Sequence, residues 1–241
     1  MPRMPSHVEV AKDNEALAHR VARWITGLAA AGAGRFSIAL SGGSTPRRLY
    51  QLLAEAPYRD ELPWDRVHWF WGDERFVPWD HPDSNYGMVR TAMLARAPVP
   101  ASNIHGISAS GTPEEAAQAY EREVKSYYGA ETLDPARPLF DLQILGLGTD
   151  GHTASLFPAT TVLGERRRWV AEVVGVKSEA RITLTYPPLE SSRHAAFLVA
   201  GAEKRAVLTR ALAGDQELPA ARLRPVGELI WFADEAARPQ A

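Results

Sequence analysis

The stretch RFSIALSGGSTPRRLYQLLAEA, residues 35–56, contains the pattern that decides the fold class. Its first part, RFSIALS at 35–41, is a short, mostly apolar run typical of a strand, and two glycines follow it. The second part, residues 45–56, indicates a helix, with Pro46 suited to the first turn. A strand that leads through a glycine turn into a helix is the unit from which α/β sheets are built.

The same alternation of strands and helices continues on both sides of this unit. Residues 14–31 place apolar side chains on one helical face, and residues 66–72 and 140–148 are apolar runs typical of strands. Further helices are predicted at 84–97, at 113–129 with Thr112 as N-cap, and at 203–214, where Gly214 closes the helix. Four more strands are predicted in RWVAEVVG (168–175), RITLTY (181–186), AAFLVAG (195–201) and LIWFAD (229–234).

This order of elements predicts an α/β fold with a Rossmann-like, largely parallel sheet and helices on both faces. Because no clear boundary interrupts the chain, residues 1–241 are expected to form a single domain. Sheets of this kind bind ligands at the carboxyl ends of their strands, so functional residues are expected in the loops that follow the strands. These loops are SGGSTP (41–46), GDER (72–75), GLGTDGH (146–152) and AGAEK (200–204).

Composition excludes several classes of function. The net charge is −2, so no global basic field attracts nucleic acid. The chain has no cysteine, which excludes disulfides, thiolate nucleophiles, zinc–thiolate sites and iron–sulfur clusters. No apolar run has the length of a signal peptide or the roughly 20 residues that span a membrane, so a cytoplasmic protein is expected. A monomer or a weak homo-oligomer is expected at this size.

Gly146, Gly148 and Gly151 have the G-x-G-x-x-G spacing of a dinucleotide-binding turn. Such a site needs a full helix directly after the third glycine. Here Pro158 stops any helix after about two turns. Glu172, at the distance of a ribose-binding acid, lies within a predicted strand and not at its end. NAD binding is therefore disfavoured, and these glycines alone indicate no more than a tight turn.

The SGGSTP loop combines features that favour an anion. Gly42 and Gly43 let backbone N–H groups approach a ligand at a predicted helix N-terminus, and the hydroxyls of Ser41, Ser44 and Thr45 add donors. The loop lacks the lysine and the spacing of a P-loop, so one phosphate on a small molecule fits better than a nucleoside triphosphate. The alternative is an ordinary helix capped by Ser44 or Thr45.

Two further loops carry residues suited to catalysis. His152, on a glycine-rich turn, is a candidate general base, and Asp150 is placed to orient its ring. Arg75 can hold an anion or a developing oxyanion, and Asp73 can accept from sugar hydroxyls. The alternatives are a structural histidine and an arginine that pairs with Asp73 or Asp83.

Other signals are weaker. Arg181 and Lys204 lie near strand ends, where cations complete a phosphate pocket, but each alone indicates little. The histidines show no H-x-x-x-H or H-x-H spacing, so no metal site is expected. The nucleophile motif G-x-S-x-G does not occur.

Taken in order, four strings resemble the 6-phosphogluconolactonases, a family related to the glucosamine-6-phosphate deaminases. They are LSGGSTPRRLY (40–50), WGDERFVP (71–78), SNYGM (84–88) and GLGTDGHTASLFP (146–158), of which the last is the most specific. The resemblance implies hydrolysis of 6-phospho-D-glucono-1,5-lactone to 6-phospho-D-gluconate in the oxidative pentose phosphate pathway. It implies no metal and no organic cofactor.

The resemblance also implies roles for the candidate residues. His152 is expected to take a proton from the water that attacks the lactone carbonyl. Arg75 and an N–H group of the 148–152 turn are expected to stabilise the oxyanion. The 6-phosphate is expected against the Gly42–Thr45 turn, with Arg181 and Lys204 as cationic partners, and the sugar hydroxyls against Asp73 and Asn85.

Two alternative functions are weighed against this one. The deaminases carry a glutamate where this chain has Phe157, and a phenyl ring cannot transfer a proton, so deaminase chemistry is disfavoured. A non-catalytic sugar-phosphate sensor that regulates transcription needs a DNA-reading module, and no helix-turn-helix segment is predicted before residue 35. The expected partner is therefore a small sugar-phosphate lactone, with neither nucleic acid nor membrane.

Overall fold

The computed structural model describes residues 6–240, and its centre is a seven-stranded sheet in the order β1-β10-β9-β6-β2-β3-β5. Every neighbouring pair in this sheet is parallel. The predicted α/β fold with a largely parallel sheet is therefore confirmed. The strands are β1 (Ser6–Ala11), β2 (Phe36–Leu40), β3 (Val67–Trp71), β5 (Ile104–His105), β6 (Phe140–Gly146), β9 (Ser192–Val199) and β10 (Glu228–Asp234).

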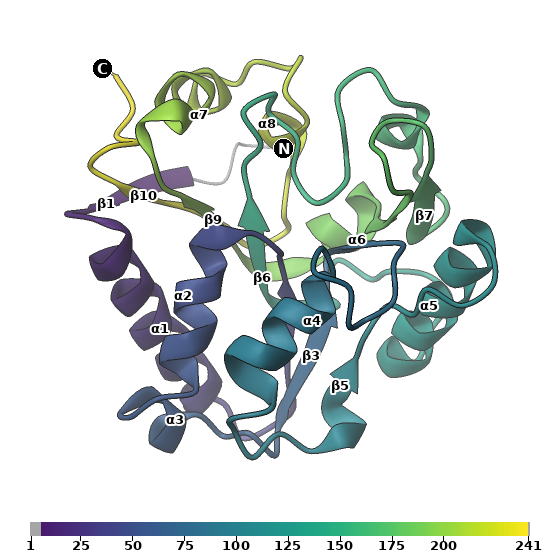
Figure 1. Ribbon diagram of the computed structural model, residues 1–241, viewed down its shortest axis with the longest axis horizontal. Helices are drawn as coiled ribbons and strands as arrows, with labels where there is room; N and C mark the ends of the chain where they lie inside the picture. Colours follow the sequence, from purple (N-terminus) through teal and green to yellow (C-terminus); the bar gives the residue numbers. More distant parts are fainter. Residues whose placement is uncertain (1–5, 241) are drawn as a thin grey trace.

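The helices lie on both faces of this sheet. They are α1 (Asn14–Ala31), α2 (Ser44–Leu53), α3 (Tyr58–Glu61), α4 (Asn85–Val89), α5 (Pro113–Tyr128), α6 (Tyr186–Glu190), α7 (Arg205–Leu212) and α8 (Pro219–Arg222). Connections from β1 to β5 run toward the β5 edge, and those from β5 to β10 run back toward β1. Because crossovers between parallel strands are right-handed, the two directions place their helices on opposite faces. Accordingly α1, α2 and α4 lie in a row (Figure 1).

A second, antiparallel sheet departs from the prediction. It has three strands in the order β4-β8-β7, namely β4 (Asp73–Arg75), β7 (Val170–Val173) and β8 (Arg181–Leu184). The predicted strands at 168–175 and 181–186 therefore do not join the parallel sheet. The segment that joins them is too short for the helical crossover that parallel pairing requires, so the chain turns back on itself. This small sheet carries Asp73 and Arg75 beyond the end of β3.

Several predicted boundaries also shift. The helix expected at 84–97 is α4 followed by a π-helical turn, Arg90–Leu94, and the one expected at 203–214 is a 3₁₀ turn, Ala202–Lys204, followed by α7. Thr112 caps α5 as predicted, in a capping box with Glu115. Strands β1 and β5 at the two edges were not predicted. Among the described residues, no helix combines the length and hydropathy that crossing a bilayer requires.

The chain reverses its direction of travel between β2 and β6, which are neighbours in the sheet. Crossovers leave β2 toward one edge and β6 toward the other, so no helix fills the space above the carboxyl ends of these two strands. A crevice at this position is the usual ligand site of open α/β sheets. Around it the sheet is densely packed, with Trp69 and Trp71 of β3 fully buried.

Candidate functional site

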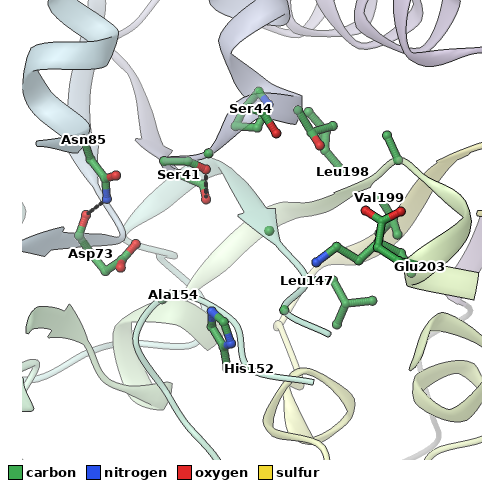
Figure 2. A pocket seen from close by; sticks show the side chains of 18 of the residues that line it. Ser41, Ser44, Asp73, Asn85, Leu147, His152, Ala154, Leu198, Val199 and Glu203 are labelled. Carbon is green, nitrogen blue, oxygen red and sulfur yellow. Dashed lines mark hydrogen bonds between the residues drawn. The ribbon is translucent and has the colours of Figure 1, made fainter. Parts of the chain in front are cut away.

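A cavity of about 260 Å³ lies at this crevice and is lined by most of the residues that the sequence predicted (Figure 2). Its walls come from the loops after β2, β6 and β9 and from β4. The predicted residues that line it are Ser41, Gly42, Gly43, Ser44, Thr45, Asp73, Arg75, Asn85, His152 and Lys204. Asp150 and Arg181 are not among its lining residues.

The glycine turn after β2 is held by a buried tyrosine. The Tyr50 hydroxyl donates to the Ser41 carbonyl at 2.8 Å and accepts from the Ser41 N–H at 3.1 Å. Burial raises the pKa of Tyr50, so its hydroxyl keeps the proton that it donates. A Cβ on Gly42 would overlap the Asn85 side chain, and Gly43 has φ +106°, so both positions require glycine.

Gly43, and not Ser44 or Thr45, is the N-cap of α2, and no side chain caps the helix. The alternative of an ordinary serine- or threonine-capped helix is therefore wrong. The hydroxyl-bearing residues Ser44 and Thr45 instead line the cavity beside the helix N-terminus. Unsatisfied N–H groups at such an end favour an anion.

Replacing Tyr50 by phenylalanine tests the two hydrogen bonds between the Tyr50 hydroxyl and the Ser41 backbone. Tyr50→Phe should lower the free energy of unfolding by about 1–3 kcal/mol, because a buried N–H and a buried carbonyl lose their partner. It should also weaken the binding of inorganic phosphate at this turn, measured as a higher dissociation constant. Tyr120→Phe is the matched control, since the Tyr120 hydroxyl bonds the N–H and carbonyl of Trp71 at 2.9 and 3.0 Å. Equal dissociation constants in the two variants would contradict the role of Tyr50 in shaping the anion site.

The three residues of β4 alternate in direction. The Asp73 carboxylate lines the cavity, and its Oδ2 accepts from the Ser155 hydroxyl at 2.7 Å. The Asn85 side chain donates to the Asp73 carbonyl at 2.9 Å, as Figure 2 shows. Arg75 also lines the cavity, and its guanidinium donates to the Asp83 carbonyl at 2.7 Å. The partner of the guanidinium is thus a neutral backbone carbonyl, which does not cancel the positive charge of Arg75.

Glu74, between them, also follows the apolar strand and would be expected to face the crevice, but it is a buried structural residue that does not line the cavity. It is 1% exposed, and its carboxylate accepts from the N–H groups of Arg75, Asn85 and Tyr86 at 2.7–2.8 Å. Ser84 adds a hydroxyl donor at 3.1 Å. Burial raises the pKa of Glu74 to about 7, although the three N–H donors oppose this shift. The carboxylate fixes the start of α4 and so the position of Asn85.

Glu74→Gln should lower the free energy of unfolding by about 1–3 kcal/mol, because the new amide NH₂ faces N–H donors. A folded-state pKa above the unfolded value means that Glu74 contributes stability at low pH and that this contribution is lost as the pH rises through about 7. Urea unfolding at about pH 5 and about pH 8 should therefore show that the free energy of unfolding falls more between these two pH values in the wild type than in the variant. An equal change in the free energy of unfolding in the two proteins would contradict the raised pKa of Glu74.

His152 is oriented by Asp150. The ring Nδ1 lies 2.5 Å from Asp150 Oδ1, which also accepts from the His152 N–H at 3.1 Å. Partial burial raises the pKa of Asp150, but these hydrogen bonds from His152 outweigh it and lower the pKa overall. With Nδ1 engaged, Nε2 is the free ring nitrogen, and Figure 2 shows the ring turned toward the cavity.

Two glycines of the 146–152 loop, Gly148 and Gly151, allow the backbone conformation that positions His152. The Gly148 N–H donates to the His152 carbonyl at 2.8 Å, and a Cβ on Gly148 would overlap the His152 ring. Gly151 has φ +82° and is crowded by Leu218. No helix follows within residues 152–160, and Glu172 lies inside β7. The helix on which a dinucleotide site depends is therefore absent, as the sequence indicated.

The basic residues separate into two groups. Lys204 lines the cavity from the 3₁₀ turn after β9, next to Glu203, which was not predicted (Figure 2). Arg181 pairs in register with Arg75 on the antiparallel β8, and its guanidinium contacts Glu179. Arg181 is not among the lining residues of the cavity, and its expected role beside Lys204 at the phosphate stays a prediction.

Apart from Glu203, the lining residues to which the sequence assigned no individual role are Gly146, Leu147, Gly148, Pro46, Ala154, Leu198, Val199 and Ala200. Most of them lie in loops that were already expected to face the ligand. Within residues 6–240 no group of three or more His, Cys, Asp or Glu side chains is arranged to hold a metal ion.

The chain is similar to several known proteins over most of its length. A 6-phosphogluconolactonase from Synechocystis sp. is 46% identical over 209 residues, covering 85% of this chain and 84% of the relative. One from Nostoc sp. is 44% identical over the same length. The crystal structure of the 6-phosphogluconolactonase from Thermotoga maritima superposes with a TM-score of 0.82 at 31% identity, covering 96% of this chain and 100% of the other.

A monomeric glucosamine-6-phosphate deaminase superposes with a TM-score of 0.80 at 19% identity, over 96% of this chain and 98% of the other, which shows the shared fold alone. The family model described as glucosamine-6-phosphate isomerases/6-phosphogluconolactonase matches residues 12–231. A match over this length shows that the chain belongs to the family of glucosamine-6-phosphate isomerases and 6-phosphogluconolactonases.

Proposed function

We propose that this protein hydrolyses 6-phospho-D-glucono-1,5-lactone to 6-phospho-D-gluconate, with His152 as the general base. The observation that carries the proposal is the convergence of His152, Arg75 and the anion-binding turn on one cavity. The names of the most similar relatives support lactone hydrolysis as the reaction.

The phosphate of the substrate binds at the N-terminus of α2. Backbone N–H groups and the hydroxyls of Ser44 and Thr45 supply donors there, and Lys204 supplies a positive charge across the cavity. This placement leaves the lactone ring between Asp73 and His152. Asp73 and Asn85 bind ring hydroxyls, since a carboxylate and an amide offer both acceptors and donors.

Hydrolysis then follows from the free Nε2 of His152. The imidazole takes a proton from a water molecule while the water oxygen bonds to C1 of the lactone, and the carbonyl electrons move onto its oxygen. Arg75 and N–H groups of the 148–152 turn stabilise that oxyanion. When the tetrahedral intermediate collapses, the bond from C1 to the ring oxygen breaks, and His152 returns its proton to that oxygen. No step requires a metal or an organic cofactor.

The direct test is lactone hydrolysis coupled to oxidation of 6-phosphogluconate, with the spontaneous reaction subtracted. Hydrolysis well above the background supports the proposal, and a rate equal to the background would overturn it. Release of ammonia from glucosamine 6-phosphate tests the deaminase alternative in parallel. No release is expected, because Phe157 stands where that chemistry needs a carboxylate. The single domain, the monomeric or weakly associated state and the cytoplasmic location stay predictions.

A further inference from the structure

A tight turn beneath the cavity contains a serine whose role the proposed reaction does not use. Thr153, Ala154, Ser155 and Leu156 form this turn, which is closed by a hydrogen bond from the Leu156 N–H to the Thr153 carbonyl at 2.9 Å. Ala154 lines the cavity and has φ +47°. This left-handed conformation costs a residue with a Cβ about 1–2 kcal/mol. Contacts made by the neighbouring residues must therefore hold the turn in place.

Ser155 makes such contacts on both sides. Its N–H donates to the Thr183 hydroxyl oxygen at 3.1 Å, and its own hydroxyl donates to Asp73 Oδ2 at 2.7 Å. Thr183 gives its single hydroxyl proton to the Leu184 carbonyl at 3.0 Å, so toward Ser155 it acts only as an acceptor. Ser155 and Thr183 are 1% and 0% exposed. The direction of every bond in this chain of contacts is thus determined.

Asp73 is the last residue in this series of hydrogen bonds, which runs from Thr183 through Ser155. It pairs in register with Thr183 across β4 and β8, which brings all three residues together. Among the side chains of residues 7–240, the Ser155 hydroxyl is the one hydrogen-bond partner of the Asp73 carboxylate, because Asn85 bonds the Asp73 backbone carbonyl instead. A carboxylate in a residue that is 8% exposed needs a hydrogen-bond donor to replace lost solvation and to keep one orientation.

We propose that Ser155 is a positioning residue for Asp73: its hydroxyl holds one carboxylate oxygen and leaves the other, Oδ1, to accept from a ring hydroxyl of the lactone. The inference rests on the proposed function. It assigns Ser155 to substrate binding and not to bond breaking, because its contacts lead to Asp73 and not to His152. The strained Ala154 is the residue that brings Ser155 under the cavity.

The test is Ser155→Ala, measured by steady-state hydrolysis of the lactone. KM should rise about tenfold, because the variant loses one hydrogen bond to a charged group. The value of kcat should change less than about threefold. Ser37→Ala is the matched control. Ser37 is also a buried serine, and its hydroxyl lies 3.1 Å from the carboxylate of an aspartate, Asp141, and 2.9 Å from the Leu139 carbonyl, but it stands at the start of β2, far from the cavity end of the strand. Ser37→Ala should have the KM of the wild type, although its free energy of unfolding should fall by about as much as that of Ser155→Ala.

A second readout separates positioning from a general loss of packing. The wild type should hydrolyse the parent lactone in preference to at least one of its three monodeoxy analogues, because Asp73 accepts from that hydroxyl. Ser155→Ala should reduce this preference by about fivefold or more. Should Ser155→Ala fail to fold, Thr183→Val provides the same test, since it removes the acceptor of the Ser155 N–H, and Thr183→Ser should restore the wild-type values.

The outcomes distinguish the two proposals. A wild-type protein that does not hydrolyse the lactone overturns the proposed function and this inference with it. Normal hydrolysis by the wild type, with Ser155→Ala matching Ser37→Ala in KM and in deoxy preference, overturns the inference about Ser155 alone. A fall in kcat without a change in KM also overturns it, because Ser155 would then act on the reaction and not on binding.

Discussion

His152→Ala should lower kcat for lactone hydrolysis by about 10²–10⁴-fold, the contribution of a positioned general base. The expectation rests on geometry, because Asp150 engages Nδ1 at 2.5 Å and leaves Nε2 as the nitrogen that can take a proton from water. His152 is the one histidine among the lining residues, and alanine removes its imidazole from the cavity. KM should change little, since the phosphate turn lies on another loop.

The measurement is the coupled assay with the spontaneous hydrolysis of the lactone subtracted at each substrate concentration. His194→Ala is the matched control. His194 also contacts a carboxylate, Glu228, at 3.2 Å, but it lies in the first part of β9, away from the carboxyl end that faces the cavity. It should retain wild-type kcat. A loss below about tenfold in His152→Ala would remove this residue from the role of base.

Arg75→Ala should lower kcat by about 10²–10³-fold, the usual effect of removing one oxyanion donor. Arg75 lines the cavity, and its guanidinium is held by the Asp83 carbonyl at 2.7 Å, so its charge is oriented before the substrate binds. The negative charge that it faces develops only in the transition state. The variant should therefore lose more in kcat than in KM.

Arg96→Ala serves as the control for loss of a positive charge, because Arg96 pairs with Glu55 at 3.1 Å and does not line the cavity. Its kinetic constants should match those of the wild type. If Arg75→Ala instead raised KM and left kcat unchanged, Arg75 would belong to binding of the ground state, and the oxyanion would depend on the 148–152 turn alone.

Some features of this protein were determined by short stretches of its sequence. The strand, glycine turn and helix at 35–56 formed β2 and α2 as expected, and the capping box at Thr112 started α5. The residues expected to face the ligand mostly do line the cavity. These features follow from apolar periodicity, turn chemistry and the rule that parallel strands end at one edge, all of which act over a few residues.

Other features were decided only by the tertiary structure. Nothing near Asp73 in the sequence indicates Ser155, which lies 82 residues away, and nothing indicates that β7 and β8 pair with β4 and place Arg181 opposite Arg75. Glu74 likewise became essential to the site only when burial brought α4 onto its carboxylate. A residue's local pattern determines whether it enters a strand or a turn. Which distant group it meets depends on packing and pairing energies summed over the whole fold, and these have no local signature in the sequence.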